Sequence, residues 1–260
     1  MVARRWPGLV ALFLLASGAW ACARVVTPQV AQTGTPILAV VTWNMHGGRG
    51  DLPRLLEELT GPLAAPADYV VLLQEAGDED GRDVRAIAAM RGLSVAFQRT
   101  PERSIGNALV STLPLESARV IELPRERQPR RALMARVHVR ELPLFVASAH
   151  LENRLGWMRG LFGDRARGRQ AEALIRDLPP GPGILGGDMN TMLGPEEPAW
   201  RALLERFPDT PLRPEPTFRD RLVLDHLFFD LPDGWAATRR VLPDRYGSDH
   251  HPVLGIVFSN

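Results

Sequence analysis

The residues best placed to do chemistry lie in the stretch 184–191. An apolar run, Ile184–Leu185, leads into Gly186–Gly187, and Asp188 and Asn190 follow. If the run is a buried strand, the glycines allow backbone or ligand to approach closely where it ends. Side chains two apart on an extended chain share a face, so Asp188 and Asn190 would point into the same space. A carboxylate and an amide there suit the holding of a water or phosphate oxygen near a hard cation. A simple tight turn is the competing interpretation, because Gly, Asp and Asn are common turn residues.

Further polar side chains stand at the ends of other apolar, strand-like runs. Asn44, Glu75 and His150 each close one run, Asp225 lies within another, and Asp249-His250 occupies the turn before the last. Each has a simple explanation when taken alone, such as a solvated strand end or a hydrogen-bonded core histidine. Their joint occurrence at strand ends favours a shared site.

Three other histidines, His46, His226 and His251, are interpreted as structural. His251 precedes a proline and is expected to point away from its neighbour. Cys22 is the only cysteine, so no cysteine cluster is present to favour zinc.

The elements that must position these residues mix strands and helices. The strand-like runs are residues 37–45, 68–73, 93–97, 108–112, 118–123, 132–139, 144–149, 222–229 and 253–258, besides the one that leads to Asp188. Helical periodicity covers residues 84–90, 169–178 and 196–206, and Asp51 could cap a helix with Leu52, Leu55, Leu56 and Leu59 on one face. Because strict βαβ alternation is missing, the pattern predicts an α+β fold with largely antiparallel or mixed sheets.

The N-terminus is typical of an export signal. Arg4 and Arg5 precede an apolar stretch at residues 9–15 that is too short for a comfortable transmembrane helix, and Ala19-Trp20-Ala21 offers a cleavage site. Cys22 then stands where bacterial lipoproteins carry their lipid, although the two residues before Ala21 fit that pattern imperfectly. We therefore expect a signal peptide at residues 1–23, a linker at 24–36 and a catalytic domain at 37–260. The protein is expected to be exported to the periplasm or the extracellular space, either lipid-anchored or freely secreted.

Bulk composition excludes little. The chain has 260 residues, of which 45% are hydrophobic and 23% charged, as in ordinary globular proteins. All 31 basic residues are arginine, which a compositional bias of the genome explains as well as phosphate binding does. Removing Arg4 and Arg5 from these 31 leaves 29 basic residues against 30 acidic ones. The net charge therefore indicates neither a nucleic-acid nor a membrane partner.

Seven short motifs, taken together, resemble the endonuclease/exonuclease/phosphatase superfamily, which has the DNase I-like fold. In chain order they are Thr42-Trp43-Asn44-Met45, Leu73-Gln74-Glu75, Gly106-Asn107-Ala108-Leu109-Val110-Ser111, Ser148-Ala149-His150-Leu151, Gly187-Asp188-Met189-Asn190, Leu224-Asp225-His226 and Ser248-Asp249-His250. The resemblance implies a four-layer α/β/β/α sandwich of two mixed β-sheets flanked by helices, with the site at one edge of both sheets. It also implies a divalent-metal-dependent phosphoester hydrolase.

The resemblance further implies which residues hold the metal. Glu75 matches the principal Mg²⁺ ligand, and Asn44 and Asp249 match direct or water-mediated ligands. Carboxylate and amide oxygens suit Mg²⁺ or Mn²⁺. Asn153 falls where some relatives use an amide on the phosphate, which is a weaker match.

The catalytic roles are implied in the same way. Asp188 matches the residue that orients or deprotonates the attacking water, and Asn190 one that holds this water and a phosphate oxygen. His250 matches the histidine on the scissile phosphate, steadied by Asp225, and His150 matches a second flanking residue. An Asp225–His250 pair would favour the cationic imidazole against an anionic transition state. The sequence leaves open whether Asp188 or His250 is the general base, and whether one or two metal ions act.

Family membership does not name the substrate. A nuclease or other phosphodiesterase and a phosphatase both stay open, as does an enzyme of phospholipid head groups or inositol phosphates at a membrane. The one basic run is interpreted as solvated turn charges: Arg125, Arg127, Arg130 and Arg131. A membrane-touching helix is an alternative for Trp157, Met158, Leu161 and Phe162 beside Arg154, Arg159, Arg165 and Arg167. A catalytically silent binding module is the alternative of another class, and a monomer is expected.

Overall fold

The apolar runs form the strands of two stacked β-sheets. The computed structural model describes residues 34–63, 66–77, 81–153, 163–192, 194–212 and 215–260, which belong to one compact unit. Outside these residues lie the expected signal peptide with Cys22, most of the expected linker, and Arg154, Trp157, Met158, Arg159, Leu161 and Phe162.

The first sheet has six strands. In spatial order they are β10 (Trp235–Val241), β11 (Val253–Ser259), β1 (Thr35–Asn44), β2 (Tyr69–Ala76), β4 (Gly106–Ser111) and β3 (Ser94–Arg99). β1 pairs with β2 in parallel and with β11 antiparallel, so the sheet is mixed. Leu38 and Val40 of β1 face the core between the sheets, whereas Val41 and Trp43 face the core on the outer side. Burial on both faces explains why this strand is a continuous apolar run.

The second sheet has five strands. In spatial order they are β5 (Glu116–Glu122), β6 (Arg131–Val139), β7 (Leu142–His150), β8 (Gly183–Asp188) and β9 (Asp225–Asp230). Only the β7–β8 pair is parallel, so this sheet is mixed as well. The predicted fold class, with two mixed sheets, is therefore confirmed.

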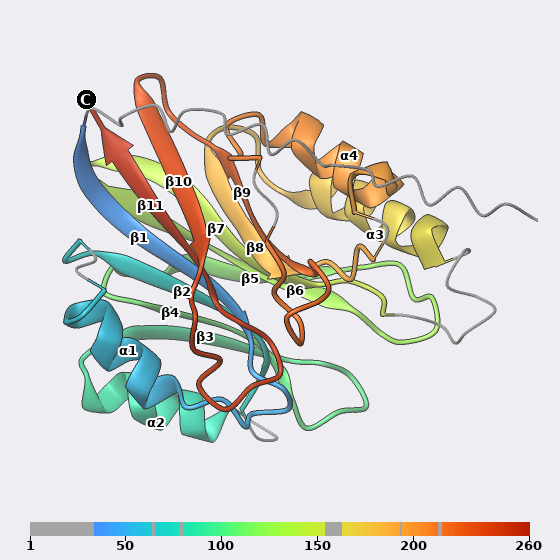
Figure 1. Cartoon of the computed structure of the whole chain (residues 1–260), viewed down its shortest axis with the longest axis horizontal. Coiled ribbons are helices and arrows are strands. Elements are labelled where there is room, and N and C mark those ends of the chain that lie inside the picture. Colours follow the sequence, from blue (N-terminus) through green and yellow to red (C-terminus); the bar gives the residue numbers. More distant parts are fainter. Residues whose placement is uncertain (1–33, 64–65, 78–80, 154–162, 193, 213–214) are drawn as a thin grey trace, which may run out of the picture. The chain divides into compact units, whose positions relative to one another are not determined.

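Helices cover the outer faces of both sheets (Figure 1). α1 (Leu52–Thr60) and α2 (Arg82–Met90) pack on the first sheet, and α3 (Gly163–Asp177) and α4 (Pro198–Arg206) pack on the second. The Asp51 side chain accepts a hydrogen bond from the Arg54 amide at 3.1 Å, which confirms the predicted cap of α1. The layers are thus α/β/β/α.

The main differences from the sequence prediction concern three elements. β10 is missed because Arg239 and Arg240 interrupt its apolar pattern, and it is an edge strand that pairs only with β11. α3 begins at Gly163, six residues before its predicted start near 169, and continues through Gly168. A Cβ on Gly168 would lie 3.3 Å from the Pro198 Cβ, so the glycine allows α3 and α4 to approach closely. The segment before α4, Gly194–Glu196, is a 3₁₀ turn rather than part of that helix.

Arg167 corrects part of the membrane interpretation. Its side chain is only 2% exposed and forms a two-pronged ion pair with Glu197, at 2.7 and 2.9 Å. Arg167 therefore joins α3 to the segment before α4 and does not face a membrane surface.

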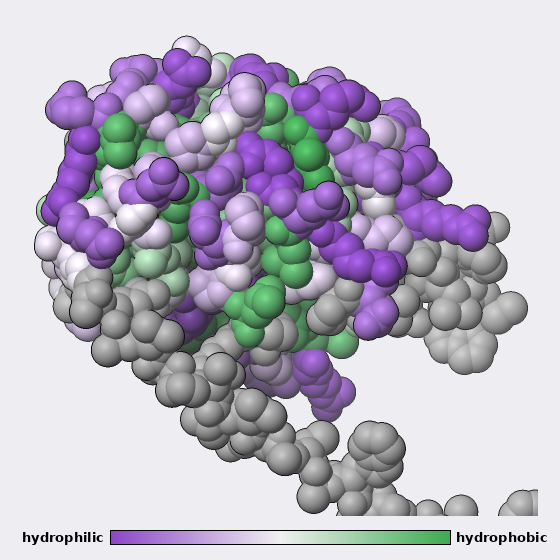
Figure 2. Space-filling view, turned by 90° about the horizontal axis from the view of Figure 1, so that it is seen from above, coloured by the Kyte–Doolittle hydropathy of each residue, from purple (hydrophilic) through white to green (hydrophobic). Residues whose placement is uncertain are grey.

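The described surface is mainly polar. On the face in Figure 2, apolar residues form small separate groups between hydrophilic ones. Within the described residues, the large apolar side chains that are exposed lie on different elements: Met90, Val120, Leu142 and Leu212. No helix of the described chain is long and apolar enough to cross a membrane.

Candidate active site

The strands that carry polar ends meet at one edge of the sandwich. β1 ends at Asn44 and β2 carries Glu75 near its end, both in the first sheet. In the second sheet β7 ends at His150, β8 ends at Asp188, and β9 begins at Asp225. Neighbouring strands hold these positions in register, since His150 pairs with Asp188 and Asp188 with Asp225.

These side chains line a single pocket of about 280 Å³. Its walls are Asn44, His46, Glu75, His150, Asn153, Asp188, Asn190, Met192, Phe218, Leu224, Asp249 and His250. Every site residue expected from the sequence is among them except Asp225, which is fully buried against His250. The structure thus brings together residues from positions 44 to 250 of the chain.

The glycine pair before Asp188 makes this packing possible on both faces of β8. A Cβ on Gly186 would lie 2.8 Å from the Thr42 Cβ of the first sheet. A Cβ on Gly187 would lie 2.0 Å from the Ala149 carbonyl oxygen of β7. The predicted close approach of backbone at this strand end is confirmed, and any side chain here would displace the strand that carries Asp188.

Asp188 and Asn190 share the pocket, but not because the chain stays extended. Asn190 has a left-handed backbone (φ 52°), and its amide donates a hydrogen bond to Asp188 Oδ1 at 3.1 Å. Its side-chain amide donates to the Leu151 carbonyl at 3.2 Å. The extended geometry expected here is wrong, because a local turn directs Asn190 into the pocket.

An irregularity at the end of β2 turns Glu75 into the pocket. The β2–β4 register shifts between Leu73 and Ala76, and Glu75 has a left-handed backbone (φ 49°). The preceding Gln74 stays between the sheets, where it donates to Ser148 Oγ at 2.9 Å. Strain at Glu75 is thus held by surrounding structure, as is common at functional sites.

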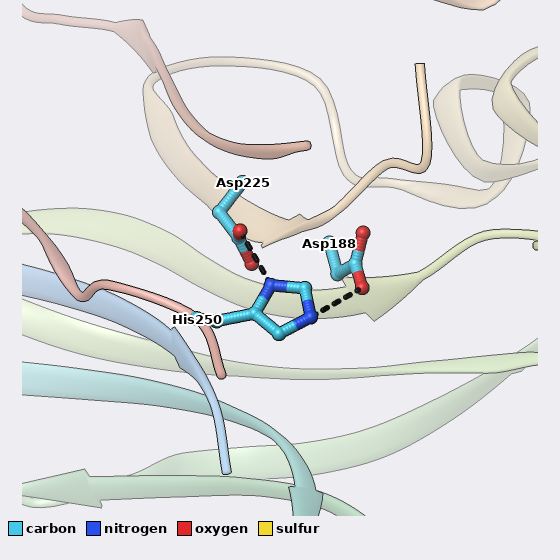
Figure 3. Close-up of side chains that lie close together, drawn as sticks. All are labelled: Asp188, Asp225 and His250. Atoms are coloured by element: carbon cyan, nitrogen blue, oxygen red, sulfur yellow. Dashed lines mark hydrogen bonds and ion pairs between the residues drawn. The ribbon is translucent and has the colours of Figure 1, made fainter. Parts of the chain in front are cut away.

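Asp225, His250 and Asp188 form a chain of interactions (Figure 3). Asp225 Oδ2 lies 2.8 Å from His250 Nδ1, and His250 Nε2 lies 3.9 Å from Asp188 Oδ2. The loop that holds His250 is tied to β1, because the Trp43 indole N–H donates to the His250 carbonyl at 3.1 Å. One face of the imidazole contacts Phe218, with ring centroids 4.7 Å apart.

These contacts raise the pKa of both reacting groups above their ordinary values. Burial lowers the pKa of His250, but attraction and hydrogen bonding from Asp225, with attraction from Asp188 and Asp249, outweigh it and raise the pKa to about 9. Burial, followed by the charge of Asp225, raises the pKa of Asp188 to about 7, against the opposing effects of His250, Asn44 and the Asn190 amide. Near neutral pH, His250 is therefore a cation beside a carboxyl group that is able to accept a proton.

His150 is the neutral histidine of the site. Burial, followed by the charges of Arg130, His250 and Arg103, holds its pKa well below the usual value. His150 Nε2 lies 3.5 Å from Asp188 Oδ2, and Nδ1 lies 4.0 Å from Glu75 Oε1. It is suited to contact a phosphate as a neutral hydrogen-bonding group.

The donor set on the first-sheet side suits a hard cation. Glu75 and Asp249 present carboxylates whose side chains are 23% and 20% exposed. The Asn44 amide oxygen accepts one hydrogen bond, from the His46 amide at 3.0 Å, and keeps a second lone pair. Oxygen donors of this kind fit Mg²⁺ or Mn²⁺.

Asp188, Asp225 and His250 are a poorer metal centre, although they offer ligand atoms within 4.8 Å of one another. His250 Nδ1 is engaged by Asp225, and the raised pKa of His250 favours the imidazolium, which has no free lone pair. The geometry instead suits the holding and transfer of a proton.

Sequence reasoning missed some pocket residues. His46, interpreted as structural, lines the pocket with Nδ1 3.4 Å from Asp249 Oδ1. Phe218 lines it as well, and no sequence signal marked that residue. The structural interpretation holds for His226, which is buried with Nε2 3.0 Å from Thr191 Oγ1, and for His251, whose ring nitrogens contact the Leu242 carbonyl and Asp220.

The comparisons with known proteins agree with this arrangement. The model of the Endonuclease/Exonuclease/phosphatase family matches residues 41–250. A sequence comparison with curated proteins gives no match, so the family assignment rests on the family model and the fold.

Several solved structures share the fold at low sequence identity. The human nocturnin catalytic domain with bound sulfate is 19% identical, with a TM-score of 0.63 over 86% of this chain and 96% of that one. A mannosyl-6-phosphatase of Bacteroides thetaiotaomicron is 13% identical, with a TM-score of 0.62 over 85% and 99%. D. rerio TDP2 with a single-strand DNA product is 16% identical, with a TM-score of 0.61 over 85% and 99%. Because the family model covers most of the chain and the pocket carries the reacting groups, the protein belongs to the Endonuclease/Exonuclease/phosphatase family and is a phosphoester hydrolase.

Proposed function

We propose that the enzyme depends on Mg²⁺ or Mn²⁺ and hydrolyses its phosphoester by direct attack of water. Glu75, Asn44 and Asp249 would hold the cation. When bound, such an ion neutralises phosphate charge and acidifies a coordinated water. The observation that carries the proposal is the single pocket in which these oxygen donors and the Asp188–His250 pair face the same space.

The remaining groups have roles that follow from their protonation states. Asp188 accepts the proton of the attacking water, because its pKa of about 7 places it near neutral pH in a form that can take up a proton. Asn190 orients this water and a phosphate oxygen. His250, kept cationic by Asp225, stabilises the negative charge that develops on phosphate. His150 and Asn153 contact the phosphate as neutral groups.

The proposal is tested by hydrolysis of bis(p-nitrophenyl) phosphate with Mg²⁺, Mn²⁺ or Ca²⁺. We expect turnover by the wild-type protein with Mg²⁺ or Mn²⁺, and its loss in Glu75→Gln and Asp188→Asn. Asp177→Asn, which removes an exposed carboxylate at the end of α3, is the matched control and should keep full activity. Wild-type protein that is inactive with all three metals would favour the binding module.

A parallel screen of candidate substrates would identify the substrate class. Plasmid DNA tests for a nuclease, sphingomyelin vesicles test for a phospholipid hydrolase, and inositol phosphates and sugar phosphates test for a phosphatase. The screen needs several substrate classes, because one protein of similar fold is named as a mannosyl-6-phosphatase and another was solved with a single-strand DNA product.

A further inference from the structure

Arg130 is a buried cation behind the residues that line the pocket, and the catalytic roles leave it unused. Its side chain was expected to be a solvated turn charge, but the residue is only 4% exposed. Within the described chain its Nε atom has no hydrogen-bond partner, and no carboxylate forms an ion pair with it. A buried guanidinium without a partner is costly, so its burial calls for an anion that arrives from outside.

The position of Arg130 beside the second sheet is close to the proposed active site. The residue precedes β6, which pairs with β7 through Ala132 and Ala149, so it lies at the His150 end of the second sheet. The carboxylates that interact with its charge are those of Asp188, Glu152 and Glu75. Two of these three line the pocket, so the charge of Arg130 acts on the groups that would surround a bound phosphate.

The carboxylates near Arg130 have other partners. Glu152 Oε2 accepts the amides of Arg127 and Gln128 at 3.0 and 2.9 Å, whereas its Oε1 is buried without a hydrogen-bond partner in the described residues. Asp188 accepts Asn44 and the Asn190 amide, and Glu75 belongs to the proposed cation site. These carboxylates attract Arg130 through space, but within the described residues none of them forms an ion pair with its guanidinium.

The surrounding loop holds Arg130 firmly and adds further polar groups. The Glu152 contacts fix the turn before Arg130, and the Leu123 amide donates to the Arg130 carbonyl at 3.2 Å. Arg103 donates to Gln128 Oε1 at 3.2 Å, and Gln128 in turn donates to Asn153 Oδ1 at 3.4 Å. A preorganised corner of this kind suits the two-pronged binding of phosphate oxygens by arginine.

We propose that Arg130 binds a terminal oxygen of the scissile phosphate and thereby makes the enzyme prefer phosphomonoesters to diesters. The phosphate of a diester has two non-bridging oxygens. In the proposed function, one faces the bound cation and the other faces His250 and Asn190. A monoester offers a third oxygen and a second negative charge near neutral pH. This inference rests on the proposed function and names its substrate class.

The test compares p-nitrophenyl phosphate with bis(p-nitrophenyl) phosphate, which share a leaving group. We expect wild-type kcat/KM to be higher for the monoester. Arg130→Ala should lower kcat/KM for the monoester roughly 10- to 100-fold, the range of a lost charge-assisted hydrogen bond, and change the diester value much less. Arg130→Lys keeps the charge but not the planar guanidinium, so its kcat/KM for the monoester should lie between the values of wild type and Arg130→Ala. It also serves as the folded comparison if the alanine variant unfolds.

The control is Arg131→Ala, which removes the neighbouring arginine and its surface ion pair with Glu122. It should leave the monoester-to-diester ratio unchanged. Binding of inorganic phosphate, measured by calorimetry, should weaken in Arg130→Ala and not in the control. Equal losses on both substrates, an unchanged ratio or a wild-type preference for the diester would overturn the inference. Wild-type protein that hydrolyses neither ester but binds phosphate through Arg130 would instead overturn the proposed function.

Discussion

Asp225→Asn tests the electrostatic arrangement of the site most directly. The substitution keeps the shape of the residue that contacts His250 at 2.8 Å but removes its charge. The rise of the His250 pKa from 6.5 to about 9 corresponds to roughly 3 kcal/mol between the protonated and neutral forms. Asp225 is the main source of this rise and burial opposes it, so without Asp225 the pKa should fall at least to its ordinary value of 6.5.

The effect on rate follows from the fraction of His250 that is protonated. With a pKa of about 9 this fraction is roughly 90% at pH 8, and with a pKa near 6.5 it is about 3%. We therefore expect kcat/KM at pH 8 to fall about 30-fold in Asp225→Asn, by protonation alone. The acid limb should also move to lower pH, because the charge of Asp225 helps to raise the pKa of Asp188. The whole profile thus shifts toward acid.

The free energy of unfolding of the wild-type protein should also decrease at alkaline pH, as His250 loses its proton. The folded-state pKa of His250 is raised above the unfolded value, so its stabilisation is complete below pH 6.5 and is lost as the pH rises through about 9. Asp225→Asn should lack this loss. The measurements are pH profiles of kcat/KM and of the free energy of unfolding, with NMR titration of the histidine ring protons.

The matched control is Asp230→Asn at the other end of β9, where the carboxylate pairs with Arg206. It should leave both limbs of the profile in place. The reasoning is refuted if His250 of the wild-type protein titrates below pH 7, or if the alkaline limb stays near pH 9 in Asp225→Asn.

The other predictions concern packing and the metal. Gly187→Ala should lower Tm and activity together, because the added Cβ would lie 2.0 Å from a carbonyl oxygen of β7. The control is Gly61→Ala, whose added Cβ would lie 3.4 Å from the nearest atom and should be tolerated. Thermal melts and activity assays of both variants check this prediction. Arg167→Met should destabilise the fold by about 3–5 kcal/mol because it removes the two-pronged partner of the buried Glu197 charge. Adding Glu197→Leu should restore much of the loss, as measured by urea unfolding. Chelation should abolish hydrolysis and leave Tm within a few degrees, and added Mg²⁺ or Mn²⁺ should restore it; activity that survives exhaustive chelation would contradict the metal assignment.

The sequence predicted the parts of the site that depend on strand ends. Glu75, His150 and Asp188 each follow an apolar run that burial on both faces forces into a central strand, so their convergence needed only the sheet to form. The resemblance to a family then assigned roles that composition and spacing could not supply.

The parts that it missed depend on contacts between distant segments. Arg130 and Arg167 are charged residues whose burial is set by tertiary neighbours, and nothing local distinguishes them from the exposed Arg125. β10 was missed for a similar reason, since an edge strand tolerates the arginines that a central strand would exclude. Asn190 reaches the pocket through a left-handed turn, and the residue type alone does not predict this conformation.

The pairing of β1 with β11 joins the first described strand to the last. Asp249 and His250 come immediately before β11, so a growing polypeptide lacks both until residue 250 has been synthesised. Chains that stop before this point lack the cationic histidine and one proposed metal ligand, and we expect them to be inactive. For an enzyme that attacks a bond as widespread as the phosphoester, this order of synthesis restricts its chemistry to chains that extend through β11.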